Sequence, residues 1–358
     1  MYMYTIDYEL KHYEPVKQAR TRHGRKNRTK APPWLFDNGN AHSSTTPGPI
    51  MEKPRSIRKV FESRPVTEGA GVHLRRAFGF SHLPMFDPFL LLDDFRSSNP
   101  EDYRKGFPWH PHRGIETITY LLEGSVEHRD SLGNRGVIHP GDVQWMTAGS
   151  GIIHEEMPKG DAGGNVAGFQ LWANLPASRK MTPPRYRDVH SSSIPELHRE
   201  DGVLVRIVCG EVEGVEGAVS GIDVDPEYLD VTIPPETVWL HPVREGYTAL
   251  AYVIAGDGCF SHDTESFRYD TEGVSYFDME SGPRLGNETL VLFEKDGDHL
   301  HIATEENALR FLFFSGRPLD EPVAWHGPIV MNTRAELQTA FEEYENGSFL
   351  KKSAPRSP

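Results

Sequence analysis

The stretch of sequence from His110 to Pro158 reads HPHRGIETITYLLEGSVEHRDSLGNRGVIHPGDVQWMTAGSGIIHEEMP. Within it, short runs rich in β-branched and aromatic residues, such as 117–122 and 143–146, alternate with Gly, Pro and Asp. Apolar runs of about four to eight residues between turn residues are typical of β-strands. The stretch therefore predicts an all-β domain, built as a sandwich or a barrel.

Two short motifs at the ends of this stretch supply residues that bind metals. HPH at 110–112 and HEE at 154–156 each place two ligand-type side chains at positions i and i+2. On a β-strand such residues point to the same face, so each motif can offer a pair to one ion. Imidazole and carboxylate without thiolate suit Fe, Mn, Ni, Cu or Zn, and an incomplete protein ligand set leaves positions for water, oxygen or substrate. The pattern predicts a reactive metal site.

A second block of strand-like runs begins near residue 202. Its segment ALAYVIAG at 249–256 parallels TITYLLEG at 117–124, which predicts two copies of one β-fold with a boundary between about residues 185 and 200. HLH at 299–301 repeats the His-x-His pattern, but no second His and Glu pair accompanies it, so we interpret it as structural. The runs of the second block are 203–208, 228–233, 249–254, 289–293 and 309–314.

The two ends of the chain differ from its body. Residues 1–50 hold 8 Lys and Arg against 4 Asp and Glu and show no regular hydrophobic period, which predicts a disordered basic tail. Near the other end, Thr333 and Glu336 form a capping box ahead of an amphipathic pattern. This pattern predicts a C-terminal helix that packs across a domain.

Length and charge exclude several classes of protein. The chain has 358 residues, enough for two domains. Beyond residue 50 it holds 30 basic against 48 acidic residues, and this negative charge disfavours direct binding of nucleic acid. No apolar run is long enough to span a membrane and no secretory signal pattern is present, so we expect a cytoplasmic protein without membrane contact. Cys209 and Cys259 are too few for a disulfide framework.

The stretch quoted above resembles the pirin family of bicupins, and the resemblance covers essentially residues 55–350. It implies two tandem cupin barrels, which are double-stranded β-helices, with a C-terminal helix. Further matching text is PFLLLDDF at 88–95, FQLWANLP at 169–176 and GRPLDEPVAWHGPIVMNT at 316–333. The domains expected on this basis are a tail over 1–50, a metal-binding N-terminal cupin domain over 51–187, and a C-terminal cupin domain without metal over 198–350.

In that family the first barrel holds a metal, typically iron. By resemblance, the ligands are His110, His112, His154 and Glu156. The general cupin pattern offers a different carboxylate, Glu116, which follows the second histidine of the pair by four residues. By strand parity Glu116 faces the same side as His112, so it is a candidate ligand, base or hydrogen-bond acceptor for a ligand histidine. The pirin pattern favours Glu156 as the ligand and leaves Glu116 the acceptor role.

The resemblance also implies a function. We expect an Fe(II)-dependent dioxygenase of the quercetin 2,3-dioxygenase type, which opens a flavonol ring with O2, with Mn, Ni, Cu or Zn as alternative metals. Glu156 or Glu116 would take the hydroxyl proton of the flavonol as general base. The alternative is an iron-redox-sensitive regulatory protein that binds a transcription factor or a metabolic enzyme. A metal-free cupin scaffold is a third, less specific hypothesis.

Overall fold

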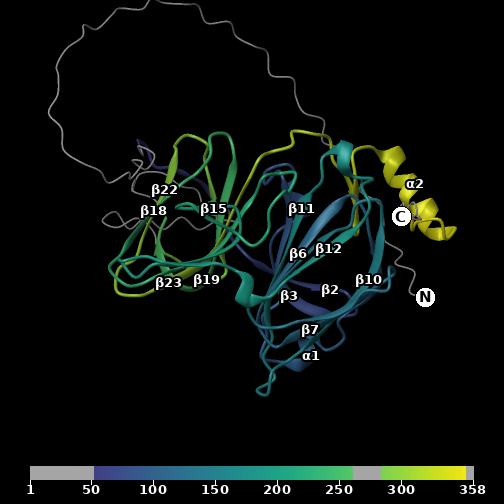
Figure 1. Cartoon of the computed structure of the whole chain (residues 1–358), viewed down its shortest axis with the longest axis horizontal. Coiled ribbons are helices and arrows are strands. Elements are labelled where there is room, and N and C mark those ends of the chain that lie inside the picture. Colours follow the sequence, from purple (N-terminus) through teal and green to yellow (C-terminus); the bar gives the residue numbers. More distant parts are fainter. Residues whose placement is uncertain (1–51, 261–283, 352–358) are drawn as a thin grey trace, which may run out of the picture.

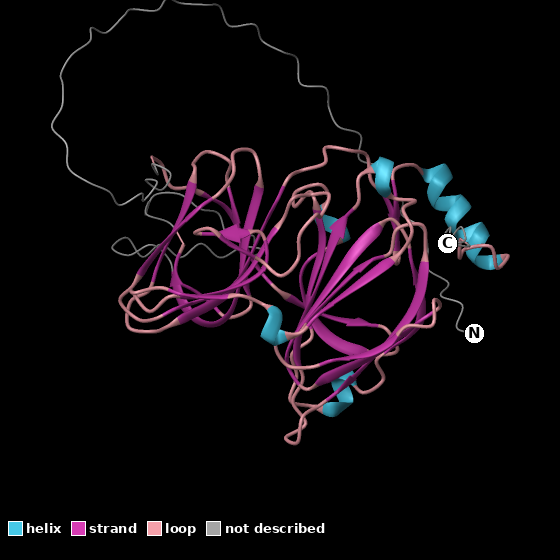
Figure 2. Cartoon of the chain, in the orientation of Figure 1, coloured by secondary structure: helices cyan, strands magenta, loops and turns pink. Residues whose placement is uncertain are grey.

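The computed structural model describes residues 52–260 and 284–351, and these residues form two β-barrels side by side (Figure 1). Strands dominate both barrels, and helices are few and short (Figure 2). The predicted all-β fold with two cupin barrels and a C-terminal helix is therefore confirmed. The tail predicted over 1–50 lies outside the described residues. Among the described residues, no helix is long and apolar enough to cross a membrane.

The first barrel consists of a large and a small antiparallel sheet. The large sheet has the order β12 (Arg185–Val189), β9 (Val143–Thr147), β6 (Ile115–Glu123), β11 (Ala167–Asn174), β4 (Phe89–Asp94), β3 (Val72–Phe78) and β2 (Arg64–Glu68). The small sheet has the order β5 (Phe107–His112), β10 (Ile152–Lys159), β7 (Ser125–Asp130) and β8 (Arg135–Ile138). Both metal-binding motifs thus lie on neighbouring strands of the small sheet.

The second barrel is built on a sheet that repeats this plan. Its main path is β1 (Ile57–Glu62), β21 (Thr289–Phe293), β19 (Thr248–Cys259), β23 (Leu309–Gly316), β17 (Glu227–Ile233), β14 (Leu204–Cys209) and β13 (Glu196–His198). The remaining strands of this sheet are β18 (Val238–Pro242), β20 (Arg284–Gly286) and β22 (His299–Ala303). Two small hairpins are β15 (Glu211–Val212) with β16 (Val215–Glu216) and β24 (Ala324–His326) with β25 (Ile329–Met331).

The large sheets of the two barrels share one core. A single apolar cluster contains Tyr120 and Trp145 from the first barrel and Tyr228 and Phe314 from the second. A buried polar bridge crosses the same interface, because the Tyr120 hydroxyl donates to Asp230 at 2.6 Å. The predicted linker at 185–200 is shorter than expected, since β12 still belongs to the first sheet and β13 to the second.

The chain ends depart from the expected domain boundaries. Strand β1, expected in the first domain, pairs with β21 of the second barrel over Ile57–Glu62. Conversely, the segment after about residue 322, expected in the second domain, returns to the first barrel, where Ile329 bridges Arg113. Each barrel therefore contains an element from the far end of the chain. A local sequence pattern identifies a strand but not its partner, which is why the expected boundaries of 51–187 and 198–350 missed this exchange.

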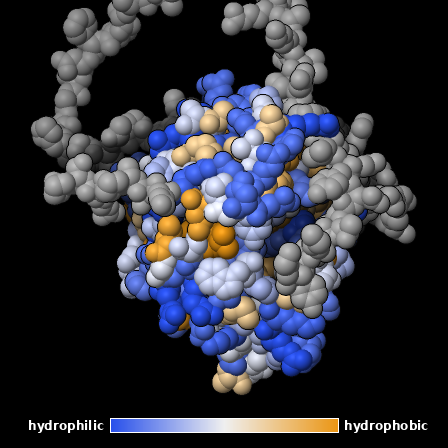
Figure 3. Space-filling model, turned by 90° about the vertical axis from the view of Figure 1, so that its right-hand side faces the viewer, coloured by the Kyte–Doolittle hydropathy of each residue, from blue (hydrophilic) through white to orange (hydrophobic). Residues whose placement is uncertain are grey.

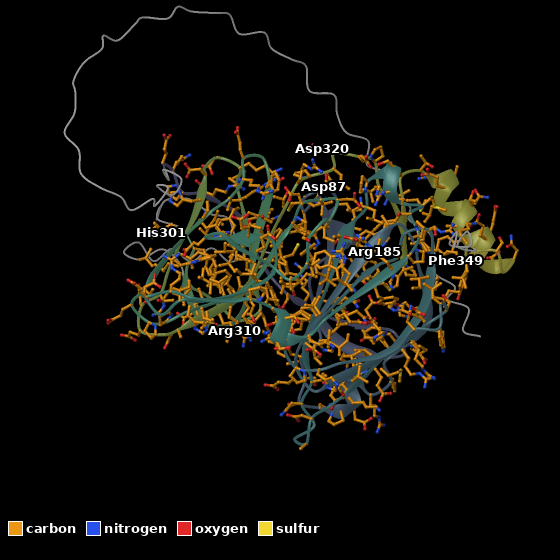
Figure 4. The ribbon with its side chains drawn as sticks, viewed as in Figure 1. Asp87, Arg185, His301, Arg310, Asp320 and Phe349 are labelled. Carbon is orange, nitrogen blue, oxygen red and sulfur yellow. The ribbon has the colours of Figure 1, made fainter. Side chains whose placement is uncertain are left out.

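The C-terminal helix α2 (Arg334–Glu345) ends this returning segment. Its capping box is as predicted, because Thr333 accepts from the Glu336 backbone N–H and the Glu336 side chain accepts from the Thr333 backbone N–H. Beyond the helix, Phe349 lies on the α2 side of the molecule (Figure 4). Its ring is 1% exposed and lies over the guanidinium of buried Arg113, 4.2 Å from ring centre to Cζ. The face of the molecule on this side is largely hydrophilic, with one small apolar patch (Figure 3). Another helix, α1 (Pro100–Tyr103), is a single turn before β5.

Candidate metal centre

Three imidazoles meet in the small sheet of the first barrel. In the antiparallel pair of β5 and β10, His154 lies directly opposite His110, and His112 follows two positions along β5. Directly opposite residues and residues at i and i+2 share a face of the sheet, so all three rings point into the barrel. The Nε2 atom of His110 lies 3.0 Å from Nε2 of His112 and 3.0 Å from Nε2 of His154. Strand parity predicted this convergence.

Two backbone carbonyls fix the tautomers of His110 and His112. Nδ1 of His110 lies 2.9 Å from the Pro108 carbonyl oxygen, and Nδ1 of His112 lies 3.2 Å from the Pro328 carbonyl oxygen. A carbonyl only accepts, so each Nδ1 must carry the proton and each Nε2 presents a lone pair. Burial lowers the pKa of all three imidazoles, which favours the neutral form that binds metals. Nitrogen lone pairs that face one another in this way suit a shared cation.

Glu156 lies beside the three imidazoles. It is 4% exposed, and its Oε2 atom lies 3.9 Å from Nε2 of His154. Two ligand atoms at about 2.1 Å from one ion are about 3–4 Å apart, so this separation fits a shared ion. Thr119 donates to Oε1 of Glu156 at 3.3 Å, and Gln170 donates to Oε2 at 3.2 Å. These donors hold the carboxylate in place next to the histidines.

Glu116 does not join this group. Its neighbour Thr119 points to the metal chamber, whereas Tyr120 points to the second barrel, and alternation along β6 places Glu116 on the Tyr120 side. There Glu116 accepts from the Thr147 hydroxyl at 2.6 Å, and burial raises the pKa of its carboxyl. The prediction that Glu116 faces the metal was wrong. Its parity was counted through Gly114, where a φ of +80° interrupts the strand between β5 and β6.

The returning C-terminal segment supplies one wall of the chamber. Besides the Pro328 carbonyl, Trp325 contributes its indole ring, 5.9 Å from the ring of Trp172. Trp172 in turn lies edge-on to His112 at 5.1 Å between ring centres. Trp325 thus packs on the first barrel. Nothing in the local sequence signalled that Pro328 would fix a ligand histidine 216 residues away.

Comparison with known proteins identifies the family of this chain. The Pirin family model matches residues 71–173, and the Pirin C-terminal cupin domain model matches residues 228–350. A pirin-like protein from Caulobacter vibrioides is 43% identical over 296 residues, which cover 82% of this chain and 99% of the relative. This chain belongs to the pirin family. The histidine cluster and Glu156 lie inside the first matched segment.

Solved structures agree with this assignment. The crystal structure of a quercetin 2,3-dioxygenase from Acinetobacter baumannii is 30% identical to this pirin, with a TM-score of 0.71 and coverage of 83% of this chain and 99% of the other. A bacterial pirin from Escherichia coli, solved in complex with nickel(II), shares the fold at 19% identity and a TM-score of 0.53, over 72% of this chain and 98% of the other.

Among its described residues, the second barrel holds no comparable group. Within the described ranges 52–260 and 284–351, the only cluster of three or more His, Cys, Asp or Glu suited to a metal is His110, His112 and His154. His299 lies 2.6 Å from the Asp298 carboxylate. Cys209 is buried, and its pKa is raised to about 12 by burial, whereas Cys259 is half-buried.

Sequence reasoning missed two residues that hold the proposed carboxylate ligand. Thr119 and Gln170 stand opposite each other on β6 and β11 and both donate to Glu156. The sequence indicates only that each of them occupies an inward-facing position of a mostly apolar strand, where a buried polar side chain needs a hydrogen-bond partner. That signal could identify them as inward-facing but not as partners of Glu156, because the contact joins two different sheets.

Proposed function

We propose that this protein is an iron-dependent dioxygenase of the quercetin 2,3-dioxygenase type. The observation that carries the proposal is the convergence of three neutral imidazole nitrogens with a buried carboxylate on one face of β5 and β10. Three His and one Glu suit Fe(II), and also Mn, Ni, Cu or Zn, with positions left for other ligands. A solved relative at 30% identity that carries the quercetin 2,3-dioxygenase name supports the substrate class.

In this proposal His110, His112, His154 and Glu156 hold the ion. A bound ion would supply Lewis acidity and an open position for the oxygens of the substrate. Glu156 would also act as general base and take the flavonol hydroxyl proton. Gln170 and Thr119 then keep the carboxylate aligned before and after the proton moves. Glu116 has no place in this scheme, because it lies on the other face of β6.

The test combines metal analysis with an oxygen-uptake assay on quercetin. Protein loaded with Fe(II) should consume O2 and bleach the flavonol absorbance in air but not under nitrogen. His110→Ala should lose both the metal and the activity, because it removes the nitrogen that lies 3.0 Å from each of the other two. Absence of turnover by protein with a full complement of Fe(II) would refute the proposal.

The second candidate is a redox-sensitive regulatory protein with the same metal centre. Trp109, next to the ligand His110, is 50% exposed and offers a large aromatic surface beside the site. Exposed aromatic residues are frequent anchors of protein interfaces. If this function holds, pull-downs with the Fe(II) and Fe(III) forms should recover different partners, a transcription factor or a metabolic enzyme, and Trp109→Ala should abolish the difference. Identical partner sets would exclude it. The proposed location, the cytoplasm, follows from the sequence pattern alone.

A further inference from the structure

His128 faces the metal chamber but is not among the converging nitrogens. On β7 it lies directly opposite Glu156 of β10, so both side chains project from the same face of the small sheet. It is 2% exposed, and the pKa of His154 is lowered by burial and then by neighbouring imidazoles, among them that of His128. His128 therefore lines the chamber beside the proposed metal ligands.

A glycine on the neighbouring strand leaves space for the His128 ring. Gly136 is the partner of His128 on β8, and a Cβ atom at Gly136 would lie 2.3 Å from Nε2 of His128. The φ of Gly136 is not positive, so space and not backbone conformation is the reason for glycine here. The imidazole lies across β8 and stacks on Tyr186 at 5.7 Å between ring centres, with 24° between the planes.

A chain of hydrogen bonds fixes the tautomer of His128. The amide nitrogen Nε2 of Gln144 lies 2.9 Å from the Asp188 carboxylate and 2.7 Å from Nε2 of His128. The carboxylate only accepts, so the amide must turn its NH2 group toward it, and the second hydrogen of that group points to His128. Nε2 of His128 is then an acceptor, and Nδ1 carries the proton.

The Nδ1–H group that results has no partner within the part of the chain that the structure describes. It is one of the buried side-chain nitrogens without a hydrogen bond. A buried donor left unpaired costs about 1–3 kcal/mol, and this cost is recovered when a ligand supplies an acceptor. Gln144 and Asp188 thus keep an unused donor on a ring that lines the chamber.

We infer that His128 recognises the substrate by donating from Nδ1–H to a substrate oxygen other than those that bind the metal. The inference rests on the proposed function and adds a requirement to it: the substrate is a polyoxygenated aromatic compound, with one oxygen group for the metal and another for His128. His128 is not one of the three converging nitrogens, and the proposal places the oxygen that it binds beside those that would bind the metal. Gln144 is a positioning residue in this arrangement.

Two flavonols test the inference. Quercetin and 3-hydroxyflavone share the 3-hydroxyl and 4-keto oxygens that would bind the metal, but quercetin has further ring hydroxyls. Their dissociation constants are measured with metal-loaded protein under nitrogen, where no turnover occurs. His128→Phe keeps the ring and removes the donor, so the affinity for quercetin should fall about tenfold while that for 3-hydroxyflavone stays within twofold. An equal fall for both flavonols, or no fall for quercetin, would overturn the inference.

Controls separate a binding role from a structural one. His73→Phe changes a histidine whose side chain is 62% exposed and should leave both affinities unchanged. Gln144→Leu keeps His128 but removes the donor that selects its tautomer. The 15N shifts of His128 should show Nδ1–H in the wild type and a mixture in this variant, with a smaller loss of quercetin affinity. A wild-type Nε2–H tautomer would overturn the inference even if His128→Phe did not fold.

The outcomes also separate the inference from the proposed function. Quercetin binding that depends on His128 but leads to no turnover refutes the dioxygenase and retains the recognition role. Turnover with unchanged affinities in His128→Phe refutes the recognition role and retains the dioxygenase. Absence of any flavonol binding by metal-loaded wild type refutes both.

Discussion

Replacing Glu156 by Gln should release the metal, whereas the same replacement at Glu116 should not. The two carboxylates are matched controls, because both are buried and both accept from a threonine hydroxyl, Thr119 in one case and Thr147 in the other. They differ in position, because Glu156 on β10 points into the metal chamber and Glu116 on β6 points away from it. Only Glu156 has an oxygen near the imidazoles, 3.9 Å from Nε2 of His154.

The size of the effect follows from these contacts. Changing a group that merely orients a metal ligand costs about 10- to 100-fold in metal affinity. Glu156→Gln removes a charged ligand itself, so we expect a loss of at least about 100-fold, which corresponds to about 2.7 kcal/mol. Oε2 of Glu156, the oxygen nearest the imidazoles, also accepts from Gln170, so the amide of the variant would place its oxygen there and its NH2 at the position of Oε1. Shape is thus kept, while a neutral amide oxygen replaces the charged ligand.

Glu116→Gln should change metal affinity less than threefold. The Thr147 hydroxyl can donate to an amide oxygen as it does to the carboxylate. Burial raises the pKa of Glu116, so the charged form is disfavoured at that site and a neutral residue adds little cost. We expect a change in the free energy of unfolding within about 1 kcal/mol.

The assay is competition with a chromophoric chelator, followed by metal quantification and the oxygen-uptake assay. Thermal melts of the apo forms show whether either variant has lost its fold. Retention of wild-type metal affinity by Glu156→Gln would refute the assignment of this carboxylate as a ligand. Equal losses in both variants would show that the different orientations of the two carboxylates do not separate their roles.

Three further predictions concern the joint between the returning C-terminal segment and the first barrel. Nζ of Lys180 donates to the carbonyl oxygens of Gly114 and Val330, and burial lowers the pKa of this side chain to about 7. The unfolded chain therefore binds more protons above pH 7, so the free energy of unfolding should rise by about 2 kcal/mol from pH 7.5 to 9. Lys180→Met should abolish this rise in urea titrations, and an unchanged dependence on pH would contradict the prediction. Phe349→Ala removes a fully buried ring that packs on Arg113. Chemical denaturation should show a free energy of unfolding lower by about 3–5 kcal/mol, and a loss below about 1 kcal/mol would show that the returning segment is not anchored at this residue. Gly114→Ala adds a Cβ atom 1.9 Å from the Val330 carbonyl oxygen, at a residue whose φ is +80°. This variant should therefore have a sharply lower melting temperature and bind metal more weakly. A melting temperature within a degree of the wild-type value would refute the close contact.

Sequence reasoning was strongest within single strands. The period of two placed His110 and His112 on one face of β5, and the family resemblance joined this pair to His154 on β10. The same rule failed for Glu116, because parity does not continue through a residue with the backbone of Gly114. The two-barrel fold followed from the repeated strand pattern and from the resemblance.

Pairing over long distances was beyond prediction for a physical reason. Strand β1 reads as a strand from its residues, but its partner β21 lies more than 200 positions further along the chain, and no local property selects it. The same holds for the chamber wall at Pro328 and for the link from Gln144 to His128, which joins two sheets. Residues that act through such contacts are found only when the strands are placed in space.

The contact between His112 and Pro328 also has a consequence for how the protein is made. The strands of the first barrel emerge from the ribosome before Pro328 is synthesised. Until then, the His112 ring lacks the carbonyl that fixes its tautomer. The metal chamber is closed only when the segment that carries Pro328 has emerged and folded back. Metal loading in its final geometry therefore waits for that segment, and a truncated product that ends within the second barrel would retain every ligand residue without forming the finished site.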